Sequence, residues 1–359
     1  MSKQKIAILY GGKSVEHGVS INSARNIFEF IDKNKFEPVL IGISSQGVWY
    51  LTPSVTKEIE SGEELSLRLN PNAPTFLTLS GKTISVDIVF PVLHGTDGED
   101  GSIQGLIKAM DIPMIGTGVL GSAMSMSKLV TKRLLKEAGL PVADFLYAYY
   151  EEKDSLQFEI ICEKLGLPFM VKSASLGSSV GVSKVKSKQD FESALQEGFR
   201  YDDCVLLESY IQGREIECAI LGNSPALASL PGEIIISKEY EFYTFDAKYV
   251  DGKAVTIEVP AKLNPVDQEK IRTLSLQAYQ TLSCEDFARV DLFLTATGEV
   301  FVNEINTIPG FTNSSMFPMM WKERGISFTE LINRLATFAM DRFQKTKRVE
   351  RGFESSLKY

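Results

Sequence analysis

The sequence has 359 residues, of which 44% are hydrophobic and 23% charged, and its 38 basic and 46 acidic side chains leave a formal charge of −8. At roughly 100–200 residues per domain, this length predicts two or three domains, and the composition excludes a disordered chain. The acidic balance disfavours a nucleic-acid partner, because phosphate contacts need a basic surface. No apolar run approaches the ~18–20 residues of a membrane span and no secretory signal is evident, so we expect a cytoplasmic protein without a membrane partner.

The first third of the chain alternates buried strand patterns with a helix pattern. Continuous apolar runs predict strands at residues 6–10, 36–43 and 86–93, and apolar residues at helical spacing predict a helix over residues 20–31. This alternation is typical of a doubly wound α/β unit with a parallel sheet, whose ligand site lies at the carboxyl ends of the strands. Residues 51–85 show no clear period and are predicted to be an irregular excursion.

Two further regions mix helices and strands. One long helix is predicted from about Ser122 to Ala138, stopped by the Gly-Leu-Pro that follows it. The later strands are predicted at residues 169–172, 180–185, 205–207, 217–221, 255–259, 288–295 and 299–306. The later helices are predicted at residues 189–198, 265–282 and 328–343.

The last two predicted strands carry the most informative pattern of polar residues. A two-residue hairpin loop at 297–298 would place Asp291 opposite Glu304 and Arg289 opposite Asn306, all on one face. Two opposed carboxylates repel, so a cation is expected between them, and oxygen ligands from Asp, Glu and Asn suit Mg²⁺ or Mn²⁺ on nucleotide phosphates. A solvated strand face with scattered charges is the alternative. A one-residue slip would send Glu304 to the other face.

A glycine- and serine-rich loop at residues 172–181 lies between two predicted strands. Its backbone amides and the hydroxyls of Ser178 and Ser179 could close over phosphates, with Lys172 supplying positive charge. It is not a Walker loop, because no Gly-Lys-Ser/Thr follows and no helix begins there. An ordinary hairpin turn explains the segment equally well.

Two other segments place backbone amides beside polar groups. At the first strand-to-helix turn the amides favour anions and Glu16 could hold an ammonium group, although an ordinary helix start is an equal alternative. Gly310 lets backbone approach a ligand and the nearby hydroxyls can bond a carboxylate, although a Pro-Gly turn also accounts for them. Taken alone, His94 would be interpreted as structural, and Lys128 and Lys248 as surface lysines.

Together these segments resemble the D-alanine–D-alanine ligases of the ATP-grasp superfamily. Five motifs carry the resemblance in family order: Gly11–Ser20, Leu93–Gly105, Lys172–Gly181, Phe242–Tyr249 and Ala288–Gly310. The resemblance implies a three-domain ATP-grasp fold of the α/β class, with an N-terminal doubly wound parallel-sheet (pre-ATP-grasp) domain and two α+β subdomains that sandwich ATP. The implied division is a substrate-binding domain at 1–117, a central subdomain at 118–207, a C-terminal subdomain with metal and catalytic residues at 208–345, and a frayed tail at 346–359.

The resemblance implies a nucleotide site with Mg²⁺ or Mn²⁺. The residues implied to bind ATP are Lys128, Lys172, Ser179, Glu208, Ser209, Ile211, Glu215 and Lys248. The residues implied to bind two metal ions are Asp291, Glu304 and Asn306. Lys128 and Lys172 match phosphate-binding lysines, Lys248 matches the lysine that reaches the γ-phosphate, and Glu215 matches the ribose binder. The sequence departs from the family pattern at Ser127, Ser173 and Ser209, where Asp, Pro, and Lys or Gln are usual.

The resemblance also implies a substrate site. The residues implied to be catalytic are Glu16, Ser178, Tyr249, Arg289 and Gly310. The residues implied to bind the substrates are Glu16, His94, Arg289, Gly310 and Ser315. Glu16 matches the residue that holds the first substrate's amine, in a hydrogen-bond relay with Ser178 and Tyr249. Arg289 and the Gly310 amide match the oxyanion site, and Ser315 matches a binder of the second substrate's carboxylate.

The implied activity is ATP-dependent ligation of two D-alanines through an acyl phosphate, for peptidoglycan synthesis, cell-wall biogenesis and cell shape. Its partners are the small molecules D-alanine and ATP and a second copy of the chain in a homodimer, and some members respond to K⁺. Tyr249 is neutral near pH 7, which predicts a dipeptide product with D-serine as a poor acceptor. The alternatives are a D-alanine–D-serine or D-alanine–D-lactate ligase, and a nucleotide-binding regulator without catalysis.

Overall fold

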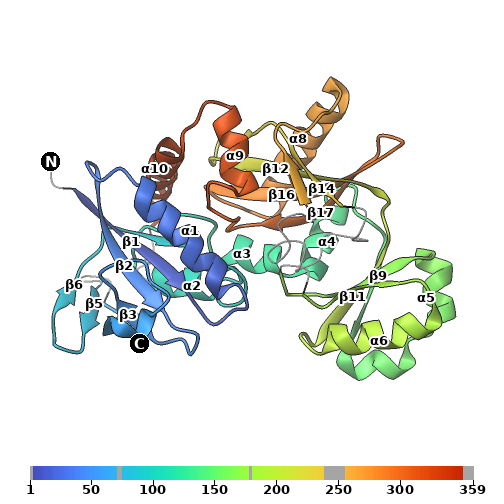
Figure 1. The fold of residues 1–359 in the computed structure, drawn as a ribbon, viewed down its shortest axis with the longest axis horizontal. Helices are drawn as coiled ribbons and strands as arrows, with labels where there is room; N and C mark the ends of the chain where they lie inside the picture. Colours follow the sequence, from blue (N-terminus) through green and yellow to red (C-terminus); the bar gives the residue numbers. More distant parts are fainter. Residues whose placement is uncertain (1–2, 71–74, 178–179, 238–254, 351–359) are drawn as a thin grey trace, which may run out of the picture.

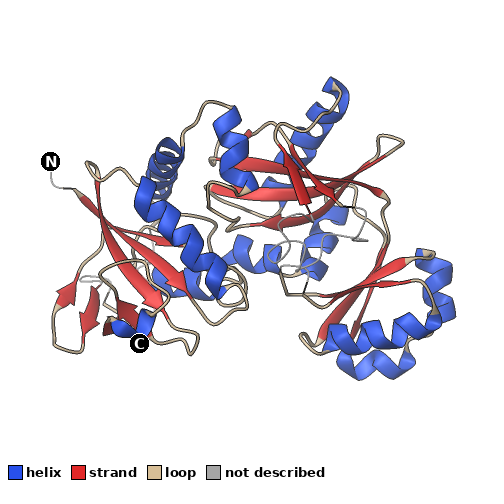
Figure 2. Ribbon diagram, viewed as in Figure 1, coloured by secondary structure: helices blue, strands red, loops and turns tan. Residues whose placement is uncertain are grey.

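Three β-sheets organise the described part of the molecule, and each is flanked by helices (Figures 1 and 2). The structure is a computed structural model that describes residues 3–70, 75–177, 180–237 and 255–350. In Figure 1 the first sheet lies at the left, the second with α5 and α6 at the right, and the third with α8 and α9 above and between them. Within the described residues, no helix has the length and apolar character needed to cross a membrane.

The N-terminal sheet has a parallel centre, as predicted. Strand β1 (Gln4–Gly11) pairs in parallel with β2 (Phe36–Ile43) and with β7 (Ile88–Pro91). Helix α1 (His17–Phe30) packs on β1, and α2 (Ser102–Ala109) follows β7. These connections bring the turns after β1 and β7 to the same edge of the sheet, where a ligand site is expected.

The prediction of an irregular excursion at residues 51–85 is wrong, because this stretch contains antiparallel strands that extend the sheet. The added elements are β3 (Trp49–Leu51), η1 (Ile59–Ser61), β4 (Glu63–Arg68), β5 (Thr75–Thr78) and β6 (Thr83–Ile84). Their strands have two to six residues, and the buried side chains Leu65 and Phe76 are too few to show a period of two.

The single long helix predicted near residues 122–138 is also wrong, because the chain forms two helices there. Helix α3 (Val119–Met126) ends at Ser127, whose backbone is extended (φ −84°, ψ 104°), and α4 (Lys128–Glu137) begins at the next residue. The Ser127 hydroxyl accepts the Val130 N–H, so this serine caps α4 as an aspartate would. The break places Lys128 at the start of a helix, where it lines a cavity between the second and third sheets.

The second sheet has the order β10-β9-β11-β8 and is antiparallel throughout. Its elements are β8 (Phe145–Tyr149), η2 (Tyr150–Ser155), α5 (Phe158–Leu165), β9 (Phe169–Ser173), β10 (Val182–Val185), α6 (Lys188–Phe199) and β11 (Cys204–Ser209). Phe169 and Val171 pack with residues of α5 and α6 in one core. The alternate residues Met170 and Lys172 therefore face the other way, into the cavity.

The third sheet has the order β15-β14-β12-β16-β17, with β13 paired to β12. Its strands are β12 (Gly213–Leu221), β13 (Leu227–Ala228), β14 (Gly232–Ile236), β15 (Val255–Glu258), β16 (Phe287–Thr295) and β17 (Val300–Asn306). Helix α8 (Pro265–Thr281) and parts of α3 and α4 share a core with one face, through residues such as Ile216, Val290 and Leu292. The opposite face is thereby left for the polar residues of the site.

The first sheet and the C-terminal region share one hydrophobic core. It joins Ile8 and Phe90 of the first sheet to Phe311 and to α9 (Met316–Glu323) and α10 (Phe328–Thr346). On α10, Arg342 donates to the carbonyls of Met114 and Gly116 and pairs with Asp286 at 2.8 Å. The tail at 351–359 lies outside the described residues, and the predicted domain boundaries remain predictions.

Candidate active site

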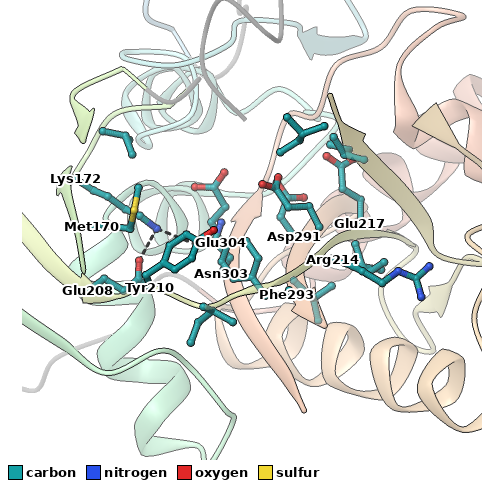
Figure 3. Close-up of a pocket in the computed structure, with 18 of the residues that line it drawn as sticks. Met170, Lys172, Glu208, Tyr210, Arg214, Glu217, Asp291, Phe293, Asn303 and Glu304 are labelled. Carbon is teal, nitrogen blue, oxygen red and sulfur yellow. Dashed lines mark hydrogen bonds and ion pairs between the residues drawn. The ribbon is translucent and has the colours of Figure 1, made fainter. Parts of the chain in front are cut away.

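A cavity of about 360 Å³ lies between the second and third sheets (Figure 3). Six of the residues predicted to bind ATP line it: Lys128, Lys172, Glu208, Ser209, Ile211 and Glu215. Arg289, Asp291 and Glu304 line it from the third sheet. Figure 3 shows Lys172 and Glu208 at the left, Asn303 and Glu304 near the centre, and Asp291 and Glu217 to their right. Ser178, Ser179, Lys248 and Tyr249 lie outside the described residues.

The predicted hairpin register is confirmed at the site and wrong at the turn. Asp291 faces Glu304 and Arg289 faces Asn306, as predicted. The loop, however, has three residues (296–298), since the Thr295 N–H donates to the Glu299 carbonyl at 2.9 Å. Gly298 takes the positive φ of 81° that such a loop needs.

A β-bulge in β17 restores the predicted pairing. Nearer the turn, Leu292 faces Val302, so Asn303 is an extra residue between this pair and the pair of Asp291 with Glu304. A bulge directs two consecutive side chains to one side of a sheet, and both Asn303 and Glu304 line the cavity. The Asn303 side-chain oxygen accepts a hydrogen bond from Lys172 Nζ at 3.3 Å, which ties the bulge to the second sheet.

The opposed carboxylates are balanced by cationic side chains. Arg289 donates to Asp291 through Nε and Nη2, both at 2.7 Å, and Asn306 Nδ2 donates to Asp291 at 3.0 Å. Lys128 Nζ lies 3.8 Å from Glu304 Oε2. Burial would lower the pKa of Arg289, but the charges of Asp291 and Glu217 raise it well above its usual value. Arg289 is therefore a permanent cation.

The oxygen donors fit a hard divalent ion held jointly with phosphates. Asp291 and Glu304 keep 16% and 26% of their side-chain surfaces exposed, so both can reach a ligand in the cavity. Among the described residues, no three His, Cys, Asp or Glu side chains form a complete metal cage. Mg²⁺ usually binds one or two protein carboxylates and takes its remaining ligands from water and substrate phosphates, which is the arrangement that this pair offers.

A buried ion triad, which sequence reasoning missed, lies at the lysine side of the cavity. Glu208 forms ion pairs with both Lys132 and Lys172, and the side chains of Lys132 and Glu208 are 1% and 2% exposed. Burial would raise the pKa of Glu208, but the charges of the two lysines lower it to about 2. Burial also lowers the pKa of Lys132. The position of Lys132, one turn after Lys128 on α4, was the only sequence signal.

Glu16 lies against both neighbouring glycine loops. A Cβ at Gly95 would lie 2.8 Å from Glu16 Oε2, and one at Gly177 would lie 3.2 Å from the same oxygen. The Glu16 carboxylate therefore sits where the first sheet meets the loop after β9. Ser173, where proline is usual, is buried and donates to the Gly198 carbonyl at 2.8 Å, so it has a packing role outside the cavity.

Side chains from α1 and from the loop after β7 hold the loop that contains Gly310. His94 Nδ1 donates to the Ile308 carbonyl at 2.8 Å, and its Nε2 accepts from Ser23 Oγ at 3.0 Å. Glu99 accepts the Ile308 N–H at 3.0 Å, and Ser23 Oγ accepts the Phe311 N–H at 3.2 Å. Burial lowers the pKa of His94, so the ring is neutral with both nitrogens engaged by the protein.

Ser315 completes this second group of residues at the start of α9. Its Oγ accepts the Thr312 N–H at 3.1 Å, and a Cβ at Gly310 would lie 2.9 Å from the same oxygen. Ser14 Oγ donates to the His94 carbonyl and accepts the Glu16 N–H, and Glu16 lies beside Gly177 of the cavity lining. This group therefore adjoins the nucleotide cavity. The described members of both predicted sites thus lie close together, although Asn306 is absent from the cavity lining and is connected to it by its hydrogen bond to Asp291.

Two α+β units face each other across the cavity, and one carries lysines while the other carries acids and an arginine. This arrangement defines an ATP-grasp fold. The family model "D-ala D-ala ligase N-terminus" matches residues 5–117, and "D-ala D-ala ligase C-terminus" matches residues 134–337. The chain belongs to the D-alanine–D-alanine ligase family.

Curated relatives and solved structures agree with this assignment. D-alanine–D-alanine ligase A of Escherichia coli (strain K12) is 44% identical over 355 residues, covering 95% of this chain and 97% of that one. The D-alanine-D-alanine ligase from Coxiella burnetii matches with a TM-score of 0.86 and 36% identity, covering 96% of this chain and 98% of that one. VanG D-Ala:D-Ser ligase from Enterococcus faecalis matches with a TM-score of 0.86 and 33% identity, covering 94% of this chain and 100% of that one.

Proposed function

We propose that this protein joins two D-alanine molecules into D-alanyl-D-alanine, converting ATP to ADP and phosphate, for peptidoglycan precursor synthesis. The observation that carries the proposal is the bidentate contact of Arg289 with Asp291 directly opposite Glu304, inside a cavity whose other wall presents Lys128 and Lys172. This charge arrangement suits a triphosphate and its metal ion, in a chain whose relatives are named for this reaction.

In the first step, a carboxylate oxygen of one D-alanine attacks the γ-phosphorus, and the bond to the β,γ-bridging oxygen breaks. The products are an acyl phosphate and ADP. Lys128 and Lys172 offset charge on the phosphates, and Arg289 stabilises charge on the transferring group. Mg²⁺ or Mn²⁺, when held by Asp291, Glu304 and Asn306, supplies further charge neutralisation.

In the second step, the neutral amine of another D-alanine attacks the acyl carbon. The developing oxyanion is stabilised by Arg289 and the Gly310 N–H. Phosphate leaves as the carbon–oxygen bond breaks, and it takes up the proton that the attacking nitrogen loses. The hydrogen bonds from His94, Glu99 and Ser23 support this role because they fix the loop that carries Gly310. We therefore assign His94 a positioning role in the substrate site.

The proposed substrate contacts follow from the second group of residues. Glu16 holds the first D-alanine's ammonium group, supported by its place between Gly95 and Gly177. Ser315, at the start of α9, binds the second D-alanine's carboxylate, where helix amides favour an anion. The relay of Glu16 with Ser178 and Tyr249, and the γ-phosphate contact of Lys248, complete the proposal. A homodimer, a cytoplasmic location and a response to K⁺ remain predictions.

D-alanine–D-serine ligation is the second candidate. It is favoured by the 33% identity to VanG D-Ala:D-Ser ligase over nearly the whole chain. A regulator without catalysis is less well supported, because the described residues include the acids, lysines and arginine that ligation needs. D-alanine–D-lactate ligation is disfavoured by the resemblance of the segment with Tyr249 to the D-alanine-specific enzymes.

The test is ADP release from purified protein with ATP and Mg²⁺, supplied with D-alanine, D-serine or D-lactate separately or in pairs. We expect D-alanine alone to give the fastest release and D-alanyl-D-alanine to accumulate. Product formed only from pairs with D-serine would establish the second candidate. Nucleotide binding without ADP release under any condition would support the regulator.

A further inference from the structure

Glu217 is an acid of the cavity that the function proposed above does not use. It lies on β12 directly opposite Asp291 on β16, which in turn lies opposite Glu304 on β17. Three carboxylates thus stand side by side across three strands on the face that lines the cavity, and all are labelled in Figure 3. Glu217 is the most deeply placed, with 4% of its surface exposed.

Arg289 is held by two of these acids from different strands. Its single Nε–H donates to Asp291 Oδ1 at 2.7 Å and its Nη2 donates to Asp291 Oδ2 at 2.7 Å, while Glu217 Oε2 forms an ion pair with Nε at 3.0 Å. The Arg289 side chain is 18% exposed, and its guanidinium must keep a fixed direction if it is to contact the transferring phosphoryl group and the oxyanion. The planar guanidinium keeps that direction when an acid fixes one of its edges.

The two anchors of Arg289 are not equivalent. Under the proposed function, Asp291 also binds a divalent cation, which competes with Arg289 for the same carboxylate oxygens. A divalent cation beside the guanidinium also repels it and weakens the hold of Asp291 on Arg289. Glu217 is less exposed than Asp291, so it is better placed to keep its contact with Nε when the cavity is loaded.

We propose that Glu217 is a positioning residue that anchors the Nε edge of Arg289 while Asp291 serves the metal ion. This inference rests on the proposed function. The two acids that contact Arg289 then have different roles: Glu217 holds the arginine and Asp291 binds the cation. Glu217 acts on the reaction only through Arg289 and does not bind the metal.

The test is Glu217→Gln, which keeps the side-chain shape and removes the charge. We expect kcat to fall by about 10-fold or more. KM for ATP and D-alanine should stay within about twofold of the native values, because the substitution weakens contacts made in the transition state. Mn²⁺ affinity of the ADP complex, measured by electron paramagnetic resonance, should stay within about twofold, whereas loss of a metal ligand would weaken it by about 10-fold or more.

The matched control is Glu285→Gln, which removes one acid from another arginine–glutamate pair. Glu285 contacts Arg342 at 3.1 Å just before β16, and it is half-buried and absent from the cavity lining. This variant should lower the unfolding midpoint and leave kcat unchanged. It therefore separates loss of a partly buried ion pair from loss of Arg289 positioning.

A double-mutant cycle tests whether Glu217 acts through Arg289. Glu217→Gln should lower kcat in the native background and have no further effect in an Arg289→Ala background. If the glutamine variant does not fold, Glu217→Asp provides the same test, with an expected loss in kcat of about threefold to 10-fold and unchanged Mn²⁺ affinity.

Unchanged kcat in a folded Glu217 variant, additive losses in the cycle, or Mn²⁺ affinity reduced 10-fold would each overturn the positioning role. Failure of the proposed function has a different signature. In that case the native protein itself makes no D-alanyl-D-alanine, whatever residue stands at position 217.

Discussion

His94 and Ile308 are joined by a hydrogen bond of 2.8 Å between positions 214 residues apart in the chain. The bond connects the loop after β7 to the loop after β17, so the first sheet controls where the Gly310 amide lies. Glu99 binds the Ile308 N–H from the same side. The substrate site is therefore built jointly by the first and third sheets, and changes in the first sheet should affect catalysis as well as binding.

Glu99 should make stability depend on pH. Burial and the charge of Glu16 raise the pKa of Glu99 from 4.5 to about 8. Between these values the folded protein holds a proton that the unfolded chain has released, so stability falls as pH rises towards 8. Glu99→Gln cannot ionise. We therefore expect the unfolding midpoint of the variant to rise relative to that of the native protein as the pH increases from 6 to 8. A constant difference across this range would contradict the prediction.

Glu304→Gln should abolish most turnover and leave the fold intact. Losing one ligand charge weakens the hold on the metal ion and misplaces the γ-phosphate, an effect of about 3 kcal/mol or more on the barrier. Without metal, the variant should be at least as stable as the native protein, because the repulsion from Asp291 is relieved. The measurements are ADP release and thermal unfolding without Mg²⁺.

Glu299→Gln, on the exposed end of the same hairpin, is the control for this experiment and should keep its activity. Near-native turnover in Glu304→Gln would exclude the assignment of Glu304 as a metal ligand.

Arg289→Lys should lower kcat by about 100-fold or more, in line with removal of an oxyanion donor. An ammonium group cannot reproduce the two-point contact that Arg289 makes with Asp291, so its charge would be misdirected. The measurement is steady-state kinetics with both substrates varied. An unchanged kcat with a raised KM would show that Arg289 only binds substrate.

Lys132→Met should destabilise the protein by about 3–5 kcal/mol, because it leaves the buried Glu208 with one cation in place of two. ATP affinity should also fall, since Lys172 would then be needed to neutralise Glu208. Lys136→Met is the control, one turn further along α4, where the lysine is exposed and lies 4.0 Å from Asp144. Its effect should be below about 0.5 kcal/mol. Equal denaturant midpoints for the two variants would refute the role of the triad.

The strands around the site were predictable, but the details of the hairpin were not. The alternation of buried and polar residues in β16 placed Arg289 and Asp291 on one face. The three-residue turn and the bulge at Asn303 shift the register in opposite senses. The pairing of Asp291 with Glu304 was therefore predicted correctly, although the prediction included neither the third loop residue nor the bulge. The bulge contacts Lys172, a residue 131 positions away, and no local pattern reports such a contact.

The buried triad shows a second limit of local patterns. Lys132 lies in a segment rich in lysine, and its sequence environment resembles that of the exposed Lys136. Only the approach of Glu208 from β11 distinguishes the two lysines. The break before α4 is different, because Ser127 is a recognised N-cap residue type and could have been predicted from the sequence.

Product analysis after competition between equal concentrations of D-alanine, D-serine and D-lactate, with ATP and Mg²⁺ at pH 7, determines which second substrate the protein joins to D-alanine. We expect D-alanyl-D-alanine as the main product, with one ADP formed for each dipeptide. A mainly D-lactate-containing product, or ADP formed without any dipeptide, would contradict this expectation.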